Sequence, residues 1–422
     1  MPKDWYRLDT AGLIFPAIAR RDWCNVFRFS ATLKEDVDPS VLQAAVNDLQ
    51  PRFPSFYVTL HRGFFWNYLQ KKSGPVTVRE DFAYPLTFMG RKELHTSCLR
   101  VFYYRNRIAA EFFHSLTDGT GGSIYVRNLV ARYLERKHGI SVPADGDVIK
   151  DLSEPPRKEE LEDSFFPHAA RAAMKEDDDP SMHLTGTKEA GGFRHLITGV
   201  IDTDRLLDAA HQYHVSVTAF LAAVMAESVI GLQADTKPFR RWRPVRISIP
   251  VDLRRLFGSR TLRNFALVVN PGVDPRFGDY TFEELCRTMS HQIASLATRQ
   301  NMAAMIAANV KPQQMLPLRL APLPIKMFAM ELVYRRRGEI GGSLNVSNLG
   351  NLFLPEVMKP YVERLEFIIG PQRSYPNNCS VASCGGVTCI NMIRGIRESG
   401  LERRFFSRLV ELGVPVSIES ND

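Results

Sequence analysis

One short segment of this chain carries side chains that are suited to proton transfer. His114 is followed four residues later by Asp118 and then by Gly119, where an apolar, strand-like run gives way to a helical pattern. An imidazole with an ordinary pKa of about 6.5 can take a proton from a substrate near neutral pH. The Asp118 carboxylate can fix the imidazole, or it can pair with a cation and brace the turn. The spacing therefore favours general-base chemistry at His114.

The same residues also have structural interpretations, which the sequence leaves open. Asp118 can serve solely as the N-cap of the following helix, and His114 can be a hydrogen-bonded core histidine. Gly119, Gly121 and Gly122 permit positive φ angles and close approach of the backbone. The stretch has neither the Gly-Lys-Ser/Thr ending of a Walker loop nor a G-x-G-x-x-G pattern, so it gives little support for nucleotide binding.

Other kinds of catalytic centre have no pattern in the sequence. Cys379, Cys384 and Cys389 are separated by four residues and not by two, so we expect no metal site. We predict instead that the six cysteines are free, buried thiols. The sequence contains no G-x-S-x-G elbow, which disfavours an α/β-hydrolase.

The composition is that of a globular protein with an excess of positive charge. Of the 422 residues, 45% are hydrophobic and 24% are charged, which excludes an intrinsically disordered chain. A formal net charge of +8 at pH 7 fits a phosphate-bearing cofactor, a nucleic acid or a membrane surface as partner. No nucleic-acid-binding motif is recognisable, so we expect no nucleic acid partner.

The N-terminus and the apolar stretches indicate an intracellular protein. The first ten residues lack the basic-then-apolar pattern of a secretory signal. The most apolar long stretch, residues 217–232, contains Glu227 and is shorter than a bilayer span. We therefore expect no transmembrane segment and a cytoplasmic location.

Strand and helix patterns that alternate along the first 145 residues must position His114. They predict a first lobe with strands over 25–29, 56–60, 76–78, 99–104 and 108–113, and with helices over 38–49 and 122–137. The strand over 108–113 and the helix over 122–137 flank the His114 segment directly. Asp38 and Pro39 mark the start of the first helix.

Residues 146–192 differ in character from both flanking regions. They are polar and punctuated by proline, with a charge run at 175–180 and one possible short helix at 166–174. We expect a crossover linker here, followed by a second lobe over 193–422. That lobe is predicted to contain strands over 195–201, 245–251, 341–348, 364–369 and 381–393, and helices over 204–213, 217–230, 282–298 and 401–412. The fold class is α+β, with two α/β two-layer lobes.

The segment His114-Ser115-Leu116-Thr117-Asp118-Gly119 resembles the H-x-x-x-D-G motif of the chloramphenicol acetyltransferase-like superfamily. That superfamily includes plant acyl-CoA-dependent acyltransferases, alcohol acetyltransferases, polyketide-associated acyltransferases and nonribosomal peptide condensation domains. The surroundings of His114 look most like the alcohol acetyltransferase branch. Three later segments are similar to further family motifs: 250–254 to the V-D-x-R strand end, 262–265 to the Asn-bearing segment, and 347–350 with 367–371 to the C-terminal structural motif.

The resemblance implies an acyltransferase with its active site in a tunnel between two lobes. An acyl thioester, here acyl-CoA as co-substrate with no bound cofactor, enters from one face, and an alcohol or amine acceptor enters from the other. The resemblance makes His114 the general base and Ser347 a candidate oxyanion donor. In the family the motif Asp mostly points away from the substrate, toward the Arg of V-D-x-R. The candidate catalytic residues are His114, Asp118 and Ser347. The candidate structural residues of the site are Gly119, Arg254 and Asn264.

Several features leave the donor open. Relatives that act on carrier proteins often have a second His where this chain has Phe113, and the plant D-F-G-W-G pattern is replaced by residues 366–370. A cationic rim for the phosphates of coenzyme A is expected at Arg240, Arg241 and Arg243, with a second run at 335–337. The alternatives are an enzyme that takes its acyl group from an acyl carrier protein, and a non-catalytic member of the fold.

Overall fold

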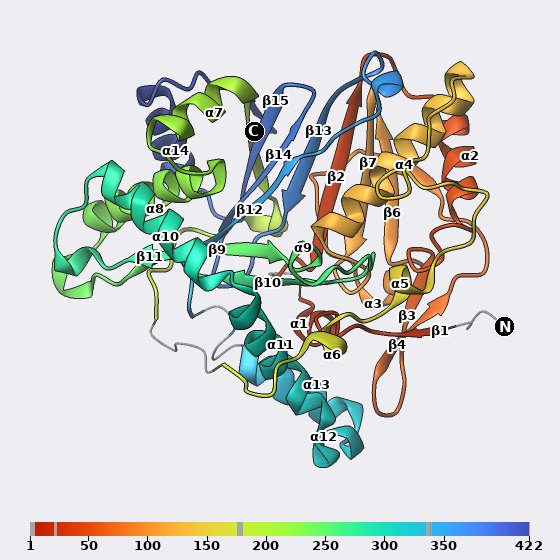
Figure 1. The fold of residues 1–422 in the computed structure, drawn as a ribbon, viewed down its shortest axis with the longest axis horizontal. Coiled ribbons are helices and arrows are strands. Elements are labelled where there is room, and N and C mark those ends of the chain that lie inside the picture. Colours follow the sequence, from red (N-terminus) through yellow and green to blue (C-terminus); the bar gives the residue numbers. More distant parts are fainter. Residues whose placement is uncertain (1–4, 21–22, 175–179, 335–337, 339, 422) are drawn as a thin grey trace.

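Two open sheets, one in each lobe, form the framework of the molecule (Figure 1). The structure is a computed structural model, and it describes residues 5–20, 23–174, 180–334, 338 and 340–421. Each lobe has its own hydrophobic core, built where helices cover its sheet. This arrangement confirms the predicted α+β class.

The sheet of the first lobe presents His114 at one of its ends. It contains, in spatial order, β13 (Val362–Ile369), β2 (Val26–Leu33), β7 (Arg107–Phe113), β6 (Leu99–Tyr104) and β5 (Val78–Glu80). β2 is buried along its whole length, which fits a strand inside a covered sheet. A smaller sheet lies beside it, with the order β1 (Trp5–Arg7), β4 (Asn67–Lys71), β3 (Val58–Arg62).

Two helices cover the sheet of the first lobe, α2 (Pro39–Leu49) and α4 (Gly119–His138). Asp38 caps α2 by accepting bonds from the Ser40 and Val41 backbone N–H groups, as its place before a proline predicts. α4 begins three residues earlier than predicted, because Asp118 caps it. Short helices α1 (Phe15–Ile18) and α3 (Arg91–Leu94) lie at the same end of the lobe as the smaller sheet (Figure 1).

The sheet of the second lobe is larger. Its strands follow the order β10 (Ala266–Val269), β9 (Val245–Asp252), β12 (Leu344–Asn351), β14 (Asn377–Cys384), β15 (Val387–Arg394), β8 (His195–Asp202) and β16 (Ser417–Ser420), and β11 (Gly272–Val273) also pairs with β9. The predicted strand over 381–393 is wrong, because this region forms the β14–β15 hairpin. Gly385 and Gly386 make its turn with φ of 59° and 85°, angles that favour glycine.

The helices of the second lobe include α7 (Thr203–Gln212), α8 (Val217–Thr236), α10 (Phe282–Leu296), α11 (Arg299–Gln314) and α14 (Gly400–Glu411). α8 extends beyond the predicted end and, among the described helices, is the one long and apolar enough to cross a membrane by length and composition. Most of its apolar stretch is buried inside the lobe, however. It therefore fits the central core helix that its apolar sequence predicts.

One strand crosses the predicted boundary between the lobes. β13 belongs to the sequence range 193–422 but pairs antiparallel with β2 in the first lobe, with Phe367 opposite Phe29. The Ser380 hydroxyl and the Asn391 amide, on β14 and β15, both donate to the Phe367 carbonyl oxygen, at 2.6 and 3.1 Å. The predicted division into 1–145, 146–192 and 193–422 is therefore wrong for β13, which joins the sheet of the first lobe. For the rest of the chain the division stays a prediction.

The crossover contributes to both cores and is more than a solvated linker. Glu160, in α5 (Lys158–Leu161), is buried and accepts two bonds from Arg52 at 2.7 and 2.8 Å. Phe165, in α6 (Phe165–His168), is buried in the core of the second lobe. The predicted helix over 166–174 is limited to α6, and most of the charge run at 175–180 lies outside the described residues.

Candidate active site

His114 lies in the loop between β7 and α4. Its backbone N–H donates to the Asn25 carbonyl oxygen at 2.8 Å. The Phe15 ring of α1 stacks on the imidazole with a centroid distance of 4.3 Å, and Phe27 contacts it edge-on at 5.0 Å. The loop and two aromatic rings thus hold the imidazole in one orientation.

Asn264 determines which nitrogen of His114 carries the proton. Its side-chain N–H₂ group donates to the His114 carbonyl oxygen at 2.9 Å and to the Asp9 carboxylate at 3.1 Å. The amide oxygen of Asn264 therefore faces Nδ1 of His114, at 3.0 Å. An oxygen can only accept, so Nδ1 carries the hydrogen and Nε2 keeps its lone pair. The sequence interpretation placed Asn264 at the site as a structural residue, and this contact gives it a definite task.

Asp9 is a residue of the site that sequence reasoning missed. It is fully buried, and it accepts bonds from the Gly12 backbone at 2.6 Å and from the Asn264 side chain. The guanidinium of Arg263 lies 3.5 Å from it. Asp9 and Asn264 thus form a chain of polar contacts that ends at the imidazole of His114. A lone aspartate near the N-terminus, far from the motif in sequence, gave no signal of this.

Burial moves the pKa values of both titratable groups in this chain of contacts. Removal from water lowers the pKa of His114 below its usual value, although the nearby Asp118 charge and the bond to Asn264 oppose this. The imidazole is therefore neutral at neutral pH. Burial raises the pKa of Asp9 to about 6, against the opposing effect of Arg263. At neutral pH, Asp9 is ionised and can hold the Asn264 amide nitrogen.

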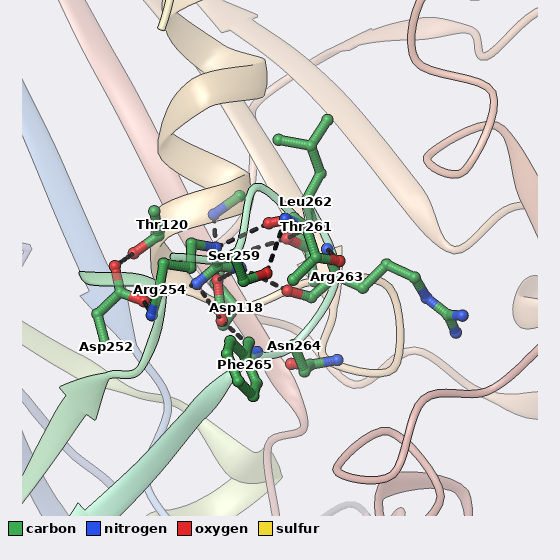
Figure 2. A network of polar contacts seen from close by, with 12 residues as sticks. Asp118, Thr120, Asp252, Arg254, Ser259, Thr261, Leu262, Arg263, Asn264 and Phe265 are labelled. Atoms are coloured by element: carbon green, nitrogen blue, oxygen red, sulfur yellow. Dashed lines mark hydrogen bonds and ion pairs between the residues drawn. The ribbon is translucent and has the colours of Figure 1, made fainter. Parts of the chain in front are cut away.

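Asp118 and Arg254 form a buried ion pair with two bonds, at 2.9 and 3.0 Å (Figure 2). The same carboxylate accepts from the backbone N–H of Gly121 at 3.1 Å and from that of Phe265 at 2.7 Å. These bonds occupy both carboxylate oxygens, and none of them goes to His114. The predicted pairing with Arg254 is confirmed, and so is the helix cap. The expectation that Asp118 is itself a catalytic residue is not supported, because its oxygens are occupied in holding the loop.

Arg254, at the start of α9 (Arg254–Phe257), has all its N–H groups engaged. Besides Asp118, its guanidinium donates to the carbonyl oxygens of Thr261 and Arg263 at 2.7 and 2.5 Å and to the Asp252 carboxylate at 2.9 Å. This accounts for the five donors of an arginine. Figure 2 shows how these bonds fasten the segment after β9 against the start of α4. Arg254 is therefore a structural residue of the site, as predicted.

The glycines of the motif serve close packing and not positive φ. None of Gly119, Gly121 and Gly122 has a positive φ, which corrects one of the two predicted uses. A Cβ on Gly121 would lie 2.2 Å from the carbonyl oxygen of Leu262, and one on Gly122 would lie 2.8 Å from the Phe27 ring. The start of α4 can therefore approach its neighbours only without side chains here.

Ser347 lies on β12, on the side of the strand that faces the first lobe. Leu344 and Val346 belong to the core of the second lobe, so by alternation Ser347 and Leu349 point the other way. A Cβ on Gly119 would lie 3.0 Å from a methyl group of Leu349. Ser347 is a buried residue, with an exposed fraction of 7%, and its hydroxyl makes no hydrogen bond to another described residue. It is thus free to donate, although its role stays a prediction.

The predicted cationic rim lies away from this group. Arg240, Arg241 and Arg243 are exposed and precede the first residue of β9, whereas Asp252 and Arg254 lie at its other end. A strand of eight residues spans about 26 Å. The structure therefore does not bring these arginines to the motif. The second run, at 335–337, lies outside the described residues.

Two cavities of the described residues lie in the first lobe, beside α1. The larger has a volume of about 130 Å³ and is lined by residues of α1, β3 and α3 and their neighbours. A smaller one, lined in part by Asn25 and Phe113, adjoins the residues that flank His114. The predicted tunnel between the lobes stays a prediction.

The cysteines are free and buried, as predicted. Burial raises the pKa of Cys286 and of Cys389 to about 12. Thiols with such pKa values are not ionised near neutral pH and make poor nucleophiles. The site therefore has a neutral imidazole that can act as a base. Neither of these two thiols is activated as a nucleophile.

Comparison with known proteins identifies the class of fold. No protein-family model matches the sequence, and neither does any curated protein sequence. Solved structures match nearly the whole chain at low identity, and they include acetyltransferases and condensation domains. The chain has the same two-lobed fold as these structures.

Three of these structures show the range of the likeness. Trichothecene 15-O-acetyltransferase from Fusarium sporotrichioides is 11% identical, with a TM-score of 0.65, over 97% of this chain and 94% of that one. Fusarium graminearum TRI101, complexed with coenzyme A and deoxynivalenol, is 10% identical, with a TM-score of 0.64, over 98% and 99%. The starter condensation domain of rhizomide synthetase, in complex with C8-CoA and Leu-SNAC, is 12% identical, with a TM-score of 0.61, over 97% and 94%.

Proposed function

We propose that this chain is an acyltransferase that moves an acyl group, expected to be acetyl, from coenzyme A to an alcohol or an amine. The observation that carries the proposal is the contact between Asn264 and His114. It leaves Nε2 of a neutral imidazole as a base, at the motif position of the superfamily's general base. The fold supports the proposal, since structures that share it include acetyltransferases and condensation domains.

The reaction needs no acyl-enzyme. Nε2 of His114 takes the proton of the acceptor hydroxyl or amine as the acceptor oxygen or nitrogen attacks the thioester carbonyl carbon. The carbonyl oxygen becomes an oxyanion, for which the Ser347 hydroxyl is the candidate donor. The intermediate collapses, the carbon–sulfur bond breaks, and the imidazolium returns the proton to the leaving thiolate. Holding both substrates together supplies part of the rate enhancement.

The remaining residues of the site act by positioning. Asp9 and Asn264 keep the imidazole in the tautomer that the reaction needs. The pair of Asp118 and Arg254 holds the motif loop against the segment that carries Asn264. His114 and Asn264 therefore stay within hydrogen-bonding distance of each other. Because these contacts lie within the protein itself, they preorganise the site for the reaction.

Coenzyme A is the proposed acyl donor, and a structural likeness favours it. TRI101 binds coenzyme A in the matching structure. The exposed arginines Arg240, Arg241 and Arg243 are the proposed contacts for the phosphates of coenzyme A. Because they lie at the far end of β9 from the motif, the bound coenzyme A would extend along the length of this strand. A carrier-protein thioester is the second candidate, because condensation domains share the fold.

An assay of free-thiol release tests the proposal. The purified chain is incubated with acetyl-CoA and a panel of alcohols and amines, and with the same acyl group on a carrier protein. We expect acceptor-dependent release from acetyl-CoA, lost in His114→Ala. Undiminished turnover in His114→Ala would contradict the general base, turnover from the carrier alone would favour the second donor, and no turnover from either would favour a non-catalytic protein.

A further inference from the structure

Two helices at one end of the molecule expose apolar side chains to solvent. α12 (Leu316–Leu320) and α13 (Leu323–Val333) project beyond both sheets at the bottom of Figure 1. On α13, Ile325, Phe328 and Leu332 follow the spacing of a single helical face. Their exposed fractions are 60%, 69% and 38%. This helix therefore turns an apolar stripe outward.

The lysine of α13 points the opposite way. Lys326 is only 2% exposed, and its ammonium group donates to the carbonyl oxygens of Phe65 and Arg319, both at 3.0 Å. The same group lies 3.7 Å from the centre of the Trp66 ring. A helix that served only to cover a core would bury its Ile and Phe and expose its Lys. Because these contacts bury Lys326, they hold the opposite, apolar side of α13 toward the solvent.

The turn between β3 and β4 extends this surface. Phe64 and Phe65 are exposed, and the Phe64 carbonyl oxygen accepts from the Leu323 backbone N–H at 2.9 Å. We call the whole set the apolar face, made of Phe64, Phe65, Met315, Leu316, Leu320, Ile325, Phe328, Leu332 and Val333. Monomeric soluble proteins rarely expose patches of this kind unless something binds there.

The charges around the apolar face are almost all positive. Residues 62–67 and 311–334 contain Glu331 as their single acidic residue, beside the exposed cations Arg62, Lys311 and Arg319. Glu331 is itself paired with Arg20, at 3.1 Å. In a dimer formed through this face, the positive charges of the two copies would repel each other. The negative headgroups of an anionic bilayer would attract these charges instead.

We propose that the apolar face docks on an anionic lipid bilayer. Its aromatic and aliphatic side chains enter the headgroup region, and the surrounding cations contact the lipid phosphates, as in interfacial helices of peripheral proteins. The face lies close to the candidate site, since α13 packs on α1 and Phe15 of α1 stacks on His114. Docking does not depend on the proposed acyltransferase activity, and its test uses no substrate.

Vesicle flotation of the purified full chain tests the docking. One set of vesicles is phosphatidylcholine alone, and the other contains phosphatidylserine as well. We expect binding to the anionic vesicles that weakens at high salt, and weaker binding to phosphatidylcholine alone. The double variant Ile325→Ser/Phe328→Ser should reduce the bound fraction by about five-fold or more, because it removes apolar area from the face.

Phe277→Ser is the matched control. Phe277 is 84% exposed and lies in another part of the chain, between β11 and α10, so its loss should leave binding unchanged. The proposal is overturned if the wild-type chain does not float with anionic vesicles, or if the double variant floats equally well. It is also overturned if the wild-type chain is a dimer that does not bind vesicles and the double variant is a monomer, because the face then joins two copies.

Discussion

Asn264 contacts His114 twice, through its amide oxygen at Nδ1 and through its amide nitrogen at the carbonyl oxygen, at 3.0 and 2.9 Å. The second bond fixes the orientation of the amide, and the orientation of the amide fixes the tautomer of the ring. A backbone carbonyl thereby decides which imidazole nitrogen is basic.

The first prediction follows from this contact. Asn264→Ala should lower kcat by roughly 10²-fold, because the imidazole loses its preferred tautomer and general-base catalysis is worth about that much. KM should change little, since substrate contacts remain. Steady-state assays check this, with thermal melting to show that the variant is folded. A variant that melts like the wild-type chain and keeps its kcat would contradict the assigned role.

The second prediction concerns the pH profile. Burial lowers the pKa of His114 below its ordinary value, so the base stays unprotonated through neutral pH. The kcat/KM of the enzyme should be flat there and fall only as the pH drops below the usual imidazole pKa, with the slope of one proton. A profile with its midpoint above the ordinary value would show that the imidazole is stabilised in its charged form, contrary to the structure.

The third prediction concerns stability and Asp9. Its pKa is raised from 3.8 to about 6 by burial, so between these values the folded chain binds more protons than the unfolded chain. The contribution of Asp9 to the free energy of unfolding therefore falls as the pH rises from about 4 to about 6, by up to about 3 kcal/mol. Urea unfolding at several pH values should show this slope in the wild-type chain relative to Asp9→Asn. Equal slopes in the two proteins would argue against the shifted pKa.

The fourth prediction concerns the ion pair of Asp118 and Arg254. Asp118→Ala should lower the free energy of unfolding by about 3–5 kcal/mol, because it leaves the buried guanidinium unpaired. The double variant with Arg254→Ala should cost less than the sum of the single variants. Urea unfolding measures all of these.

An exposed ion pair serves as the control for that measurement. Arg404 and Asp235 form a salt bridge at the surface, and Arg404→Ala should change stability by less than about 1 kcal/mol. Similar losses at the buried and exposed pairs would mean that the buried pair does not hold the loop.

The fifth prediction concerns Ser347. If its free hydroxyl donates to the oxyanion, Ser347→Ala should lower kcat by about 10²-fold or more and leave stability nearly unchanged. Ser383→Ala, on the neighbouring strand β14, is a control that removes a hydroxyl already bonded to Thr388 at 2.7 Å. A Ser347→Ala enzyme with full kcat would remove Ser347 from the reaction.

Elements with local signals could be predicted from the sequence. The strand over 99–104 has the predicted bounds, and α2 begins after its predicted cap at Asp38. The β14–β15 turn was missed although its adjacent glycines, Gly385 and Gly386, are a local signal. The helices α12 and α13 were missed because prolines punctuate this stretch and α13 is apolar on most sides, so no clear helical period marks it.

Contacts between distant segments could not be predicted from composition or periodicity. The pairing of Asp118 with Arg254 was expected through the family resemblance, because both positions lie in recognisable motifs. Asp9 lies in no motif, and its partner Asn264 is 255 residues away. The pairing of β13 with β2 likewise depends on which sheet has an edge strand without a partner. The residues of β13 itself do not encode this.

The course of β13 makes the two lobes one unit in folding and in motion. A fragment that ended before residue 362 would leave an edge of β2 without its partner, and such bare edges invite aggregation or strand exchange. Separate expression of the halves is therefore an unpromising route to a soluble protein. Because a strand and two hydrogen bonds to the Phe367 carbonyl oxygen tie the lobes together, we expect that the lobes do not move as independent bodies.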